Sequence, residues 1–202
     1  MGRSRHVPFA GSGLRQALIA VAYAVEQHAG QRRGADGAPF VLHPIEVATM
    51  LADVGASDEV VAAGALHDTI EKTSASPEDL RERFGARVTS LVVALTEDPA
   101  IPGYVARKAA LRDQVQRAGH DALLVFAADK VSKARELRMT FARDAQSGTV
   151  RRIAKNQRKL AHYRHCAEML EIRLSGSPLV ESLRHELAEL ALAERAALAG
   201  VS

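Results

Sequence analysis

The sequence has little that would support a disulfide framework, a membrane span or a nucleic-acid surface. Cys166 is the only cysteine in 202 residues, so no intrachain disulfide can form and a reducing compartment is expected. No apolar run approaches the roughly 18 residues that a membrane-spanning helix needs. Tryptophan is absent and aromatic residues make up 4% of the chain, so no stacking platform for single-stranded nucleic acid is visible.

Excess charge is also scarce. The formal net charge of +3 is compatible with an anionic small molecule, but it is too small to indicate a nucleic-acid partner. The N-terminal segment has basic residues, an apolar run and the triplet AYA, as a secretory signal has. However, Arg15 and Gln16 directly precede the run, and its apolar residues recur from Leu14 to Val25 at helical spacing. We therefore expect a cytoplasmic protein with neither nucleic acid nor membrane as a partner.

What the chain contains is a succession of amphipathic segments with the period of a helix, without convincing strand alternation. The expected helices cover residues 14–28, a stretch from 44, a stretch from 58, 77–85, 88–95, 104–118, 122–139, 149–171 and 178–198. We predict an all-α fold with a main domain at 1–172 and a C-terminal helix at 173–202. That last helix is rich in Glu, Ala and Leu, which suits packing on the body or on a second copy in a homodimer.

Two helix starts carry capping signals. Ser57 precedes two acidic residues, as an N-cap before a negatively charged first turn does. Ser76, Pro77 and Asp79 form the pattern of a capping box with proline at the first helical position. Gly85 is expected to end the helix that starts there.

Four side chains offer metal ligands: His43 in LHP, His67 and Asp68 in LHD, and Asp129 in FAAD. Two imidazoles and two carboxylates suit Mn²⁺, Fe²⁺ or Zn²⁺ better than Ca²⁺. Neighbouring residues of a helix point about 100° apart, so the HD pair can share an ion only in a seam between helices. Taken alone, His43 is also compatible with a helix start, and Asp129 with an ion pair to Arg135.

Three segments carry a family resemblance: HAGQRRGADGAPFVLHPIEVATML, AAGALHDTIEKTSASPEDLRERFGARVTSLVVALTED and FAADKVSKAREL. In this order they are similar to the "GQ.R" and "PY..HP" opening, the "HD..ED" helix with its following helix, and the "ADRLHN.R" segment of the HD-domain phosphohydrolases. Within that family, residues 28 to about 137 closely resemble the RelA/SpoT-like alarmone hydrolases. The resemblance implies an HD-domain helical bundle with a C-terminal helical extension.

The resemblance also implies a ligand set and a reaction. One divalent ion, usually Mn²⁺ in the family, would be bound by His43, His67, Asp68 and Asp129. Family members hydrolyse the 3′-pyrophosphate of guanosine tetra- or pentaphosphate, so the expected partner is an anionic, nucleotide-like small molecule. Glu71 matches the first acid of "ED", and a carboxylate beside the metal can orient or deprotonate the attacking water. Without the resemblance, Glu71 would be an exposed acid at a helix end.

Three further positions match family residues that meet the nucleotide. Arg33 matches the arginine after "GQ", and its guanidinium could stack on a base or hold a phosphate. Lys108 lies near a family lysine that meets phosphate, and Tyr163 resembles a tyrosine that packs on the nucleotide. The alternatives are an exposed basic loop, a solvated lysine and a tyrosine that packs between helices.

Lys72 and Lys133 depart from the family pattern, and the segment DKVSKARE lacks the family's usual histidine–asparagine pair. Lys72 replaces the second acid of "ED", and Lys133 replaces an asparagine near the sugar and phosphates. Both changes add positive charge to the site, so we group Lys72 with Glu71 as catalytic and assign Lys133 to phosphate binding. We predict a metal-dependent phosphohydrolase acting on a nucleotide-like phosphate or pyrophosphate ester. The alternative is a nucleotide sensor that hydrolyses weakly or not at all, because its acidic pair is Glu–Lys.

Overall fold

The computed structural model describes residues 14–147 and 150–199. Within these ranges the chain forms nine helices, and the only extended pairing is an isolated antiparallel bridge between Arg32 and Pro39. The helices are α1 (Arg15–Gln27), α2 (Leu42–Asp53), α3 (Asp58–Leu66), α4 (Thr69–Lys72), α5 (Pro77–Leu95), α6 (Tyr104–Ala118), α7 (His120–Ser147), α8 (Val150–Arg173) and α9 (Pro178–Ala199). The predicted all-α class is confirmed.

The capping signals act where the sequence places them. The Ser57 side chain accepts a hydrogen bond from the backbone amide of Val60 at the start of α3. At the start of α5, Ser76 and Asp79 form the reciprocal pair of a capping box. Gly85 interrupts α5 with a φ of 79°, a conformation that glycine adopts without strain. This kink is the helix end that the sequence predicts at Gly85.

The HD pair departs from the sequence-based expectation, because it does not lie within a continuous helix. Helix α3 ends at Leu66, His67 forms its C-cap, and Asp68 precedes the single turn of α4. The Thr69 hydroxyl donates to the carbonyl of Leu66 at 2.7 Å, which satisfies one of the carbonyls left open at the helix end. The pair therefore stands at a bend between two helices.

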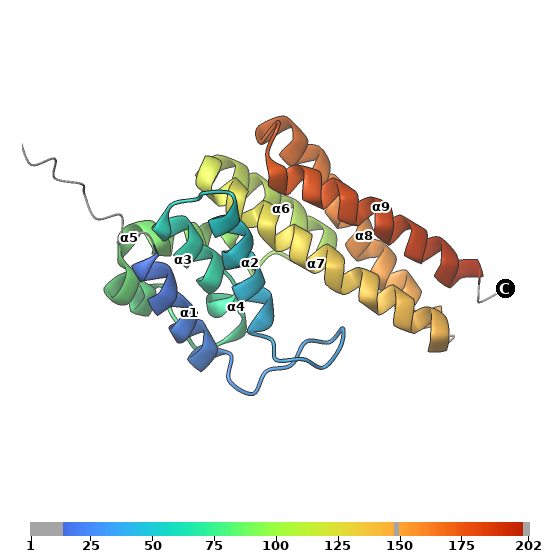
Figure 1. Cartoon of the computed structure of the whole chain (residues 1–202), viewed down its shortest axis with the longest axis horizontal. Helices are drawn as coiled ribbons and strands as arrows, with labels where there is room; N and C mark the ends of the chain where they lie inside the picture. The colour runs from blue at the N-terminus through green and yellow to red at the C-terminus, as the bar shows by residue number, and fades with distance from the viewer. Residues whose placement is uncertain (1–13, 148–149, 200–202) are drawn as a thin grey trace, which may run out of the picture.

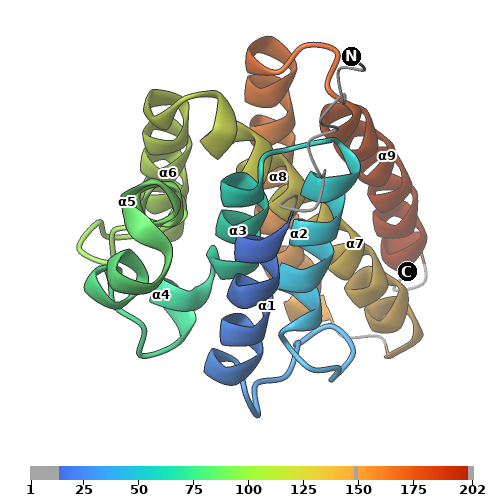
Figure 2. The same cartoon turned by 60° about the vertical axis from the view of Figure 1, so that its left-hand side comes forward.

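Helix α3 is the centre of the N-terminal part of the fold. Its residues from Val60 to Leu66 are all buried, and it packs against α1, α2, α5 and α7 (Figures 1 and 2). Gly64 permits the close approach of α2, because a Cβ at this position would lie 2.4 Å from Leu51 Cδ1. The packing of α2, α3 and α7 brings the predicted metal ligands, which are distant in sequence, to one seam.

Helices α7, α8 and α9 form the other end of the molecule, with α9 lying along α7 (Figure 1). Arg135 on α7 joins three helices, because its guanidinium lies 2.7 Å from Glu46 on α2 and 2.7 Å from Glu186 on α9. The C-terminal helix thus packs on the body of its own chain. The homodimer and the division at residue 172 stay predictions, and the predicted boundaries at 1, 149 and 202 lie outside the described residues.

Among the helices of the described ranges, none combines the length and the apolar character that crossing a membrane demands.

Candidate active site

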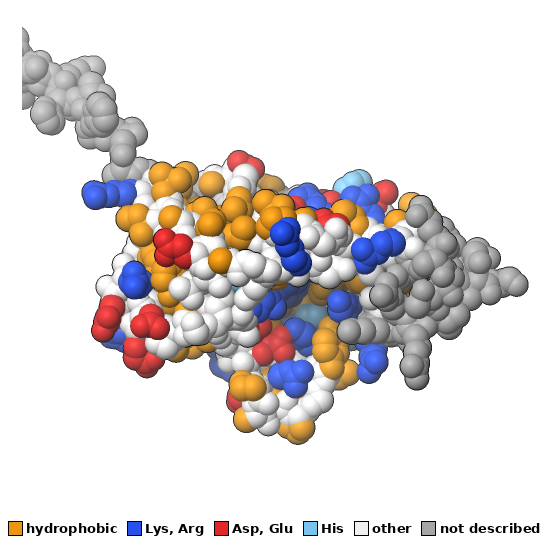
Figure 3. Space-filling view, turned by 90° about the horizontal axis from the view of Figure 1, so that it is seen from below, with side chains coloured by type: hydrophobic (Ala, Val, Ile, Leu, Met, Phe, Trp, Pro, Cys, Tyr) orange, Lys and Arg blue, Asp and Glu red, His pale blue; other side chains and the backbone are white. Residues whose placement is uncertain are grey.

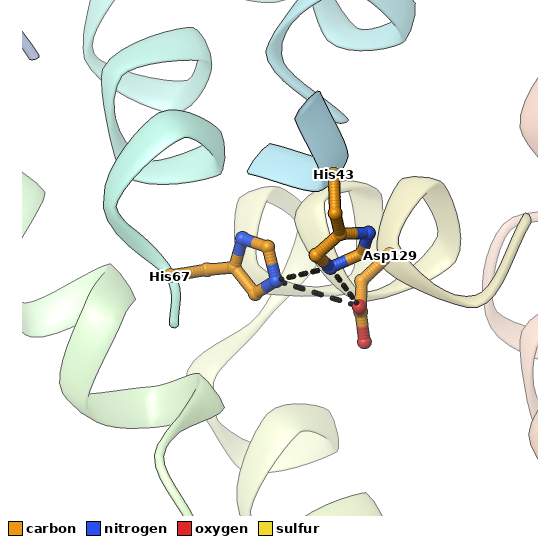
Figure 4. A group of neighbouring side chains, drawn as sticks. All are labelled: His43, His67 and Asp129. Carbon is orange, nitrogen blue, oxygen red and sulfur yellow. Dashed lines mark hydrogen bonds and ion pairs between the residues drawn. The ribbon is translucent and has the colours of Figure 1, made fainter. Parts of the chain in front are cut away.

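Four predicted ligand residues meet at the seam between α2, α3 and α7, and we call His43, His67, Asp68 and Asp129 the ligand cluster. His43 comes from the first turn of α2, His67 from the end of α3, and Asp129 from α7 (Figure 4). Asp68 follows His67 at the bend before α4. The two imidazole Nε2 atoms are 3.1 Å apart, and Asp129 Oδ1 lies 3.2 Å from that of His43 and 3.4 Å from that of His67. Asp68 Oδ2 lies 3.5 Å from both.

The partners of the two histidines fix which nitrogen carries the proton. Ser132 donates its hydroxyl to Glu46 at 2.6 Å, so its oxygen accepts from His43 Nδ1 at 2.8 Å. His67 Nδ1 lies 2.8 Å from the carbonyl of Gly64, which can only accept. In the neutral rings both Nε2 atoms are therefore acceptors. Metal-binding histidines usually have this arrangement, in which the ring nitrogen that does not bind the metal donates its N–H to an acceptor and so fixes the orientation of the ring.

The centre of the ligand cluster is consequently lined by acceptors only. Its four side chains are buried. Asp68 Oδ2 and Asp129 Oδ1 accept no well-oriented hydrogen bond from a described residue, and the cation that reaches them from outside the cluster is the ammonium of Lys133. Acceptors held together away from water repel one another unless a cation or a proton lies between them. His43, His67 and Asp129 also form a group whose ligand atoms all lie within 4.8 Å of one another. The residues present thus fit a divalent cation.

The pKa shifts agree with this arrangement. Burial lowers the pKa of His43 to about 4, so its imidazole is neutral and available as a ligand. Burial also acts to lower the pKa of His67, but the Asp68 and Asp129 carboxylates outweigh it and raise the pKa. The pKa of Asp129 is held well below its usual range, because Lys130 and Lys133 outweigh the effect of burial. Both aspartates are carboxylates at neutral pH.

A small cavity of about 110 Å³, here called the inner cavity, opens beside the cluster. His67, Asp68, Glu71 and Asp129 contribute to its wall. The Glu71 side chain is exposed, and its Oε1 accepts a hydrogen bond from the backbone amide of Glu97. Glu71 therefore lies at the mouth of the inner cavity with one carboxylate oxygen anchored.

The two lysines that depart from the family pattern both lie against the ligand cluster. Lys72 Nζ is 3.7 Å from Asp68 Oδ1 and 5.5 Å from the centre of the Phe40 ring. Lys133 Nζ is closer, at 2.9 Å from Asp129 Oδ1 and 3.7 Å from Asp68 Oδ2. Lys133 thus places a positive charge on the same oxygens that face the imidazoles.

A larger cavity of about 250 Å³, the lysine cavity, continues from the cluster. Its walls carry five lysines together with aromatic and histidine side chains; the residues are Phe40, His43, Lys72, Tyr104, Lys108, Lys130, Lys133, Glu136, Lys159, His162 and Tyr163. Four of the lysines, Lys72, Lys108, Lys130 and Lys133, also line the inner cavity. Figure 3 shows one face of the molecule on which Lys and Arg side chains border a hollow. The charge of this cavity matches an anionic ligand.

The remaining predicted contacts fall on or beside the lysine cavity. Lys108 and Tyr163 line it, and burial raises the pKa of the Tyr163 phenol, which stays protonated. Lys108 forms an ion pair with Glu97. Arg33 does not line the cavity; it pairs with Asp36 and lies 3.8 Å from Glu136 on the cavity wall. Arg33 is therefore at the margin.

Sequence reasoning missed several residues of the site. Ser132, which orients His43, stands three positions after Asp129 on α7, so helical spacing alone would have put it on the same side. Lys130 is 3% exposed and its Nζ lies 2.5 Å from Asp129 Oδ2; a lysine next to a predicted ligand was a visible signal. Tyr104 and His162 come from α6 and α8 and carried no motif that would have marked them.

The family profile described as HD domain matches residues 20–162, which is more than half of the chain and includes the whole ligand cluster. The chain belongs to the HD-domain family. It is a phosphohydrolase, as the sequence-based identification predicts. The family match ends before α9.

Relatives of this HD-domain protein point in the same direction. It is 38% identical over 126 residues to the zebrafish (Danio rerio) protein named guanosine-3′,5′-bis(diphosphate) 3′-pyrophosphohydrolase MESH1. The aligned region covers 59% of this chain and 68% of that protein. It is 36% identical over 154 residues to a GTP pyrophosphokinase of Streptomyces coelicolor, covering 75% of this chain but only 18% of that enzyme.

A solved structure is similar as well. It is described as "A metazoan ortholog of SpoT hydrolyzes ppGpp and plays a role in starvation responses", and it superposes with a TM-score of 0.72 at 25% identity. The match covers 86% of this chain and 94% of the other. The fold is thus shared along most of both chains.

Proposed function

We propose that this HD-domain phosphohydrolase removes the 3′-pyrophosphate of guanosine 3′,5′-bis(diphosphate), with one divalent cation held by His43, His67, Asp68 and Asp129. The observation that carries the proposal is the buried, acceptor-only ligand cluster that opens onto a cavity with five lysines. The curated relatives named for this reaction support it, and they favour an enzyme over a sensor without turnover.

The donor set of two imidazoles and two carboxylates suits Mn²⁺, Fe²⁺ or Zn²⁺, and the family resemblance favours Mn²⁺ among them. A cation bound there lowers the pKa of a water molecule and offsets charge on the phosphoryl oxygens. Ser132 and the Gly64 carbonyl hold the two histidines in the tautomer that presents Nε2. The protein thus supplies the ligand geometry in advance, without a rearrangement of the rings.

Glu71 is our candidate for the group that accepts the proton of the attacking water. It lines the inner cavity together with Asp68 and Asp129, and the amide of Glu97 holds one of its oxygens in place. General bases of this kind contribute about 10²–10⁴-fold to a rate. Lys72 cannot accept a proton from water while it is charged, so we assign it to the phosphoryl oxygens.

The lysine cavity would hold the nucleoside and its phosphates. Lys72, Lys108 and Lys133 line it and offer ammonium groups to the phosphates, and Tyr163 offers a protonated phenol. Arg33 at the margin is assigned to the base or to a phosphate, because a guanidinium can serve either. We propose a cytoplasmic location, since a cellular nucleotide is the substrate.

The test is hydrolysis by protein that has been stripped with a chelator and reloaded with Mn²⁺, Fe²⁺ or Zn²⁺. The metal-loaded protein is expected to release guanosine 5′-diphosphate and pyrophosphate in equal amounts, and the stripped protein to release neither. Glu71→Gln should lower kcat by about 10²-fold or more and leave nucleotide binding intact. Glu78→Gln, an exposed acid of α5, is the matched control. Tight nucleotide binding by the metal-loaded protein without pyrophosphate release would refute the proposal and favour the sensor.

A further inference from the structure

A third cavity, of about 130 Å³, lies between α6 and α8, and we call it the arginine cavity. The residues that line it are Tyr104, Val105, Lys108 and Arg112 from α6, and Arg158, Ala161, His162 and His165 from α8. The wall contains two arginines and a lysine but no carboxylate. The two helices contact each other directly, and Figure 2 shows α6 at the left of the molecule.

The two arginines differ from the other cations around the site. Arg107 and Lys108 both pair with Glu97, whereas neither Arg112 nor Arg158 has a carboxylate partner among the described side chains. Among the described residues, the guanidinium of Arg112 has one hydrogen-bond partner, His162 Nδ1, at 3.1 Å. Burial and nearby lysines lower the pKa of His162 to about 2, so this ring is neutral and accepts from the guanidinium. Arg112 is thereby fixed at the cavity wall with most of its donors uncommitted.

The arginine cavity adjoins the site. It shares Tyr104, Lys108 and His162 with the lysine cavity. Lys108 lines the inner cavity as well, so one side chain borders all three spaces. Tyr104 and His162 thus stand between the lysine cavity and the two arginines, and a molecule that occupies both cavities would pass these side chains.

We propose that the arginine cavity is a second phosphate subsite, which holds the phosphate groups of the substrate that are not cleaved. The inference rests on the proposed function, in which the 3′-pyrophosphate lies at the ligand cluster and the 5′-diphosphate points away from it. Arg112 and Arg158 present planar guanidinium groups, which bind phosphate oxygens through paired hydrogen bonds. The subsite selects nucleotides that carry phosphates at two positions of the ribose over nucleotides with one.

The first test measures binding without hydrolysis. Guanosine 5′-diphosphate carries the uncleaved phosphates but no scissile group, so the difference in its affinity between the wild-type protein and the cavity variants reports on the subsite. We expect it to bind at least tenfold more tightly than guanosine, and the Arg112→Gln–Arg158→Gln variant to lose roughly tenfold or more in affinity, as the loss of charge-assisted hydrogen bonds implies. Arg158→Gln alone removes an exposed side chain and should lose part of that affinity with the fold intact.

Arg117→Gln is the matched control, because it removes the same charge from the exposed C-terminal turn of α6, outside the cavity. Equal affinity for guanosine and guanosine 5′-diphosphate in the wild-type protein would overturn the subsite. So would equal losses in the cavity variants and in the control, since these would indicate a general effect of charge.

The second test measures hydrolysis of two substrates with the same scissile group. The cavity variants should raise KM for guanosine 3′,5′-bis(diphosphate) about tenfold and leave KM for guanosine 3′-diphosphate unchanged. If KM changes equally for both substrates, the subsite is refuted while the proposed function stands. If the wild-type protein cleaves neither substrate, the proposed function is refuted, and the binding of guanosine 5′-diphosphate still decides the subsite.

Discussion

The side chains of the ligand cluster are at most 4% exposed, whereas those of Lys72 and Lys133 beside it are 35% and 27% exposed. The cluster is held by short contacts to a second set of atoms, such as Ser132 on His43 and the Gly64 carbonyl on His67. The lysines instead reach their positions on long side chains and make ion pairs that solvent can replace.

The contrast explains where this chain departs from its family. With the proposed cation bound, the loss of one member of this buried cluster would weaken its binding and leave the remaining acceptors facing one another. A cavity lined by long cationic side chains keeps its preference for anions when single members change. Lys72 and Lys133, two departures from the family pattern, lie in the cavity wall, whereas the missing histidine of the family's histidine–asparagine pair falls at Ser132, which contacts His43.

The largest effect is expected from Asp129→Asn, which changes the ligand cluster itself. The substitution keeps the shape of the side chain but removes the charge that faces both imidazoles and compensates two lysines. We expect metal affinity to fall by more than the roughly 100-fold that a lost outer partner costs, and hydrolysis to fall with it. Metal content after gel filtration measures this. Asp113→Asn, exposed on α6, is the control, and full metal occupancy in Asp129→Asn would contradict the assignment.

A smaller effect is expected from Ser132→Ala, which leaves every ligand in place and removes only the group that orients His43. The change frees His43 Nδ1 of its acceptor and so releases the tautomer that presents Nε2. Losses of this kind reduce metal affinity by about 10–100-fold. Titration of the stripped protein with Mn²⁺ measures the shift. Ser132→Thr keeps the hydroxyl and should restore most of the affinity; if Thr and Ala behave alike, the hydroxyl has no orienting role.

The smallest effect is expected in the cavity, from Lys133→Asn. This change should increase the affinity for the metal ion and decrease the affinity for the substrate. Removing an ammonium 2.9 Å from Asp129 Oδ1 takes away a charge that repels the cation, so Mn²⁺ should bind about tenfold more tightly. The same change removes a phosphate contact and should raise KM about tenfold. Parallel titrations with Mn²⁺ and kinetics at saturating metal separate the two effects. A loss of metal affinity would place Lys133 among the residues that support the cluster.

Much of the fold was predictable, because the signals that define it are local. The capping box at Ser76 and the bounds of α6 follow from neighbouring residues, and the structure confirms both. The bend at the HD pair was not predictable, since it depends on Thr69 and His67 bonding back to the end of α3. A continuous apolar run conceals such a break.

For the site, the resemblance supplied the residues and the structure supplied their surroundings. His43, His67, Asp68 and Asp129 could be named from motifs, and the structure brings them together, although their role as ligands stays a prediction. The contributions of Tyr104 and His162 depend on how α6 packs against α8, and no local pattern encodes that packing. The environment of Lys133 is of the same kind: its sequence position showed a departure, but only the fold shows which carboxylates it touches.

The bridging guanidinium of Arg135 has a practical consequence for anyone who shortens this protein. Glu46, one of its two carboxylate partners, also accepts a hydrogen bond from Ser132, which contacts His43. Glu186, Arg135, Glu46 and Ser132 therefore form a continuous series of contacts from α9 to His43 of the ligand cluster. The stretch recognised as the family ends at residue 162, well short of that helix. Truncating the protein at the end of the recognisable domain would therefore remove Glu186 and with it the first contact of the series that ends at His43.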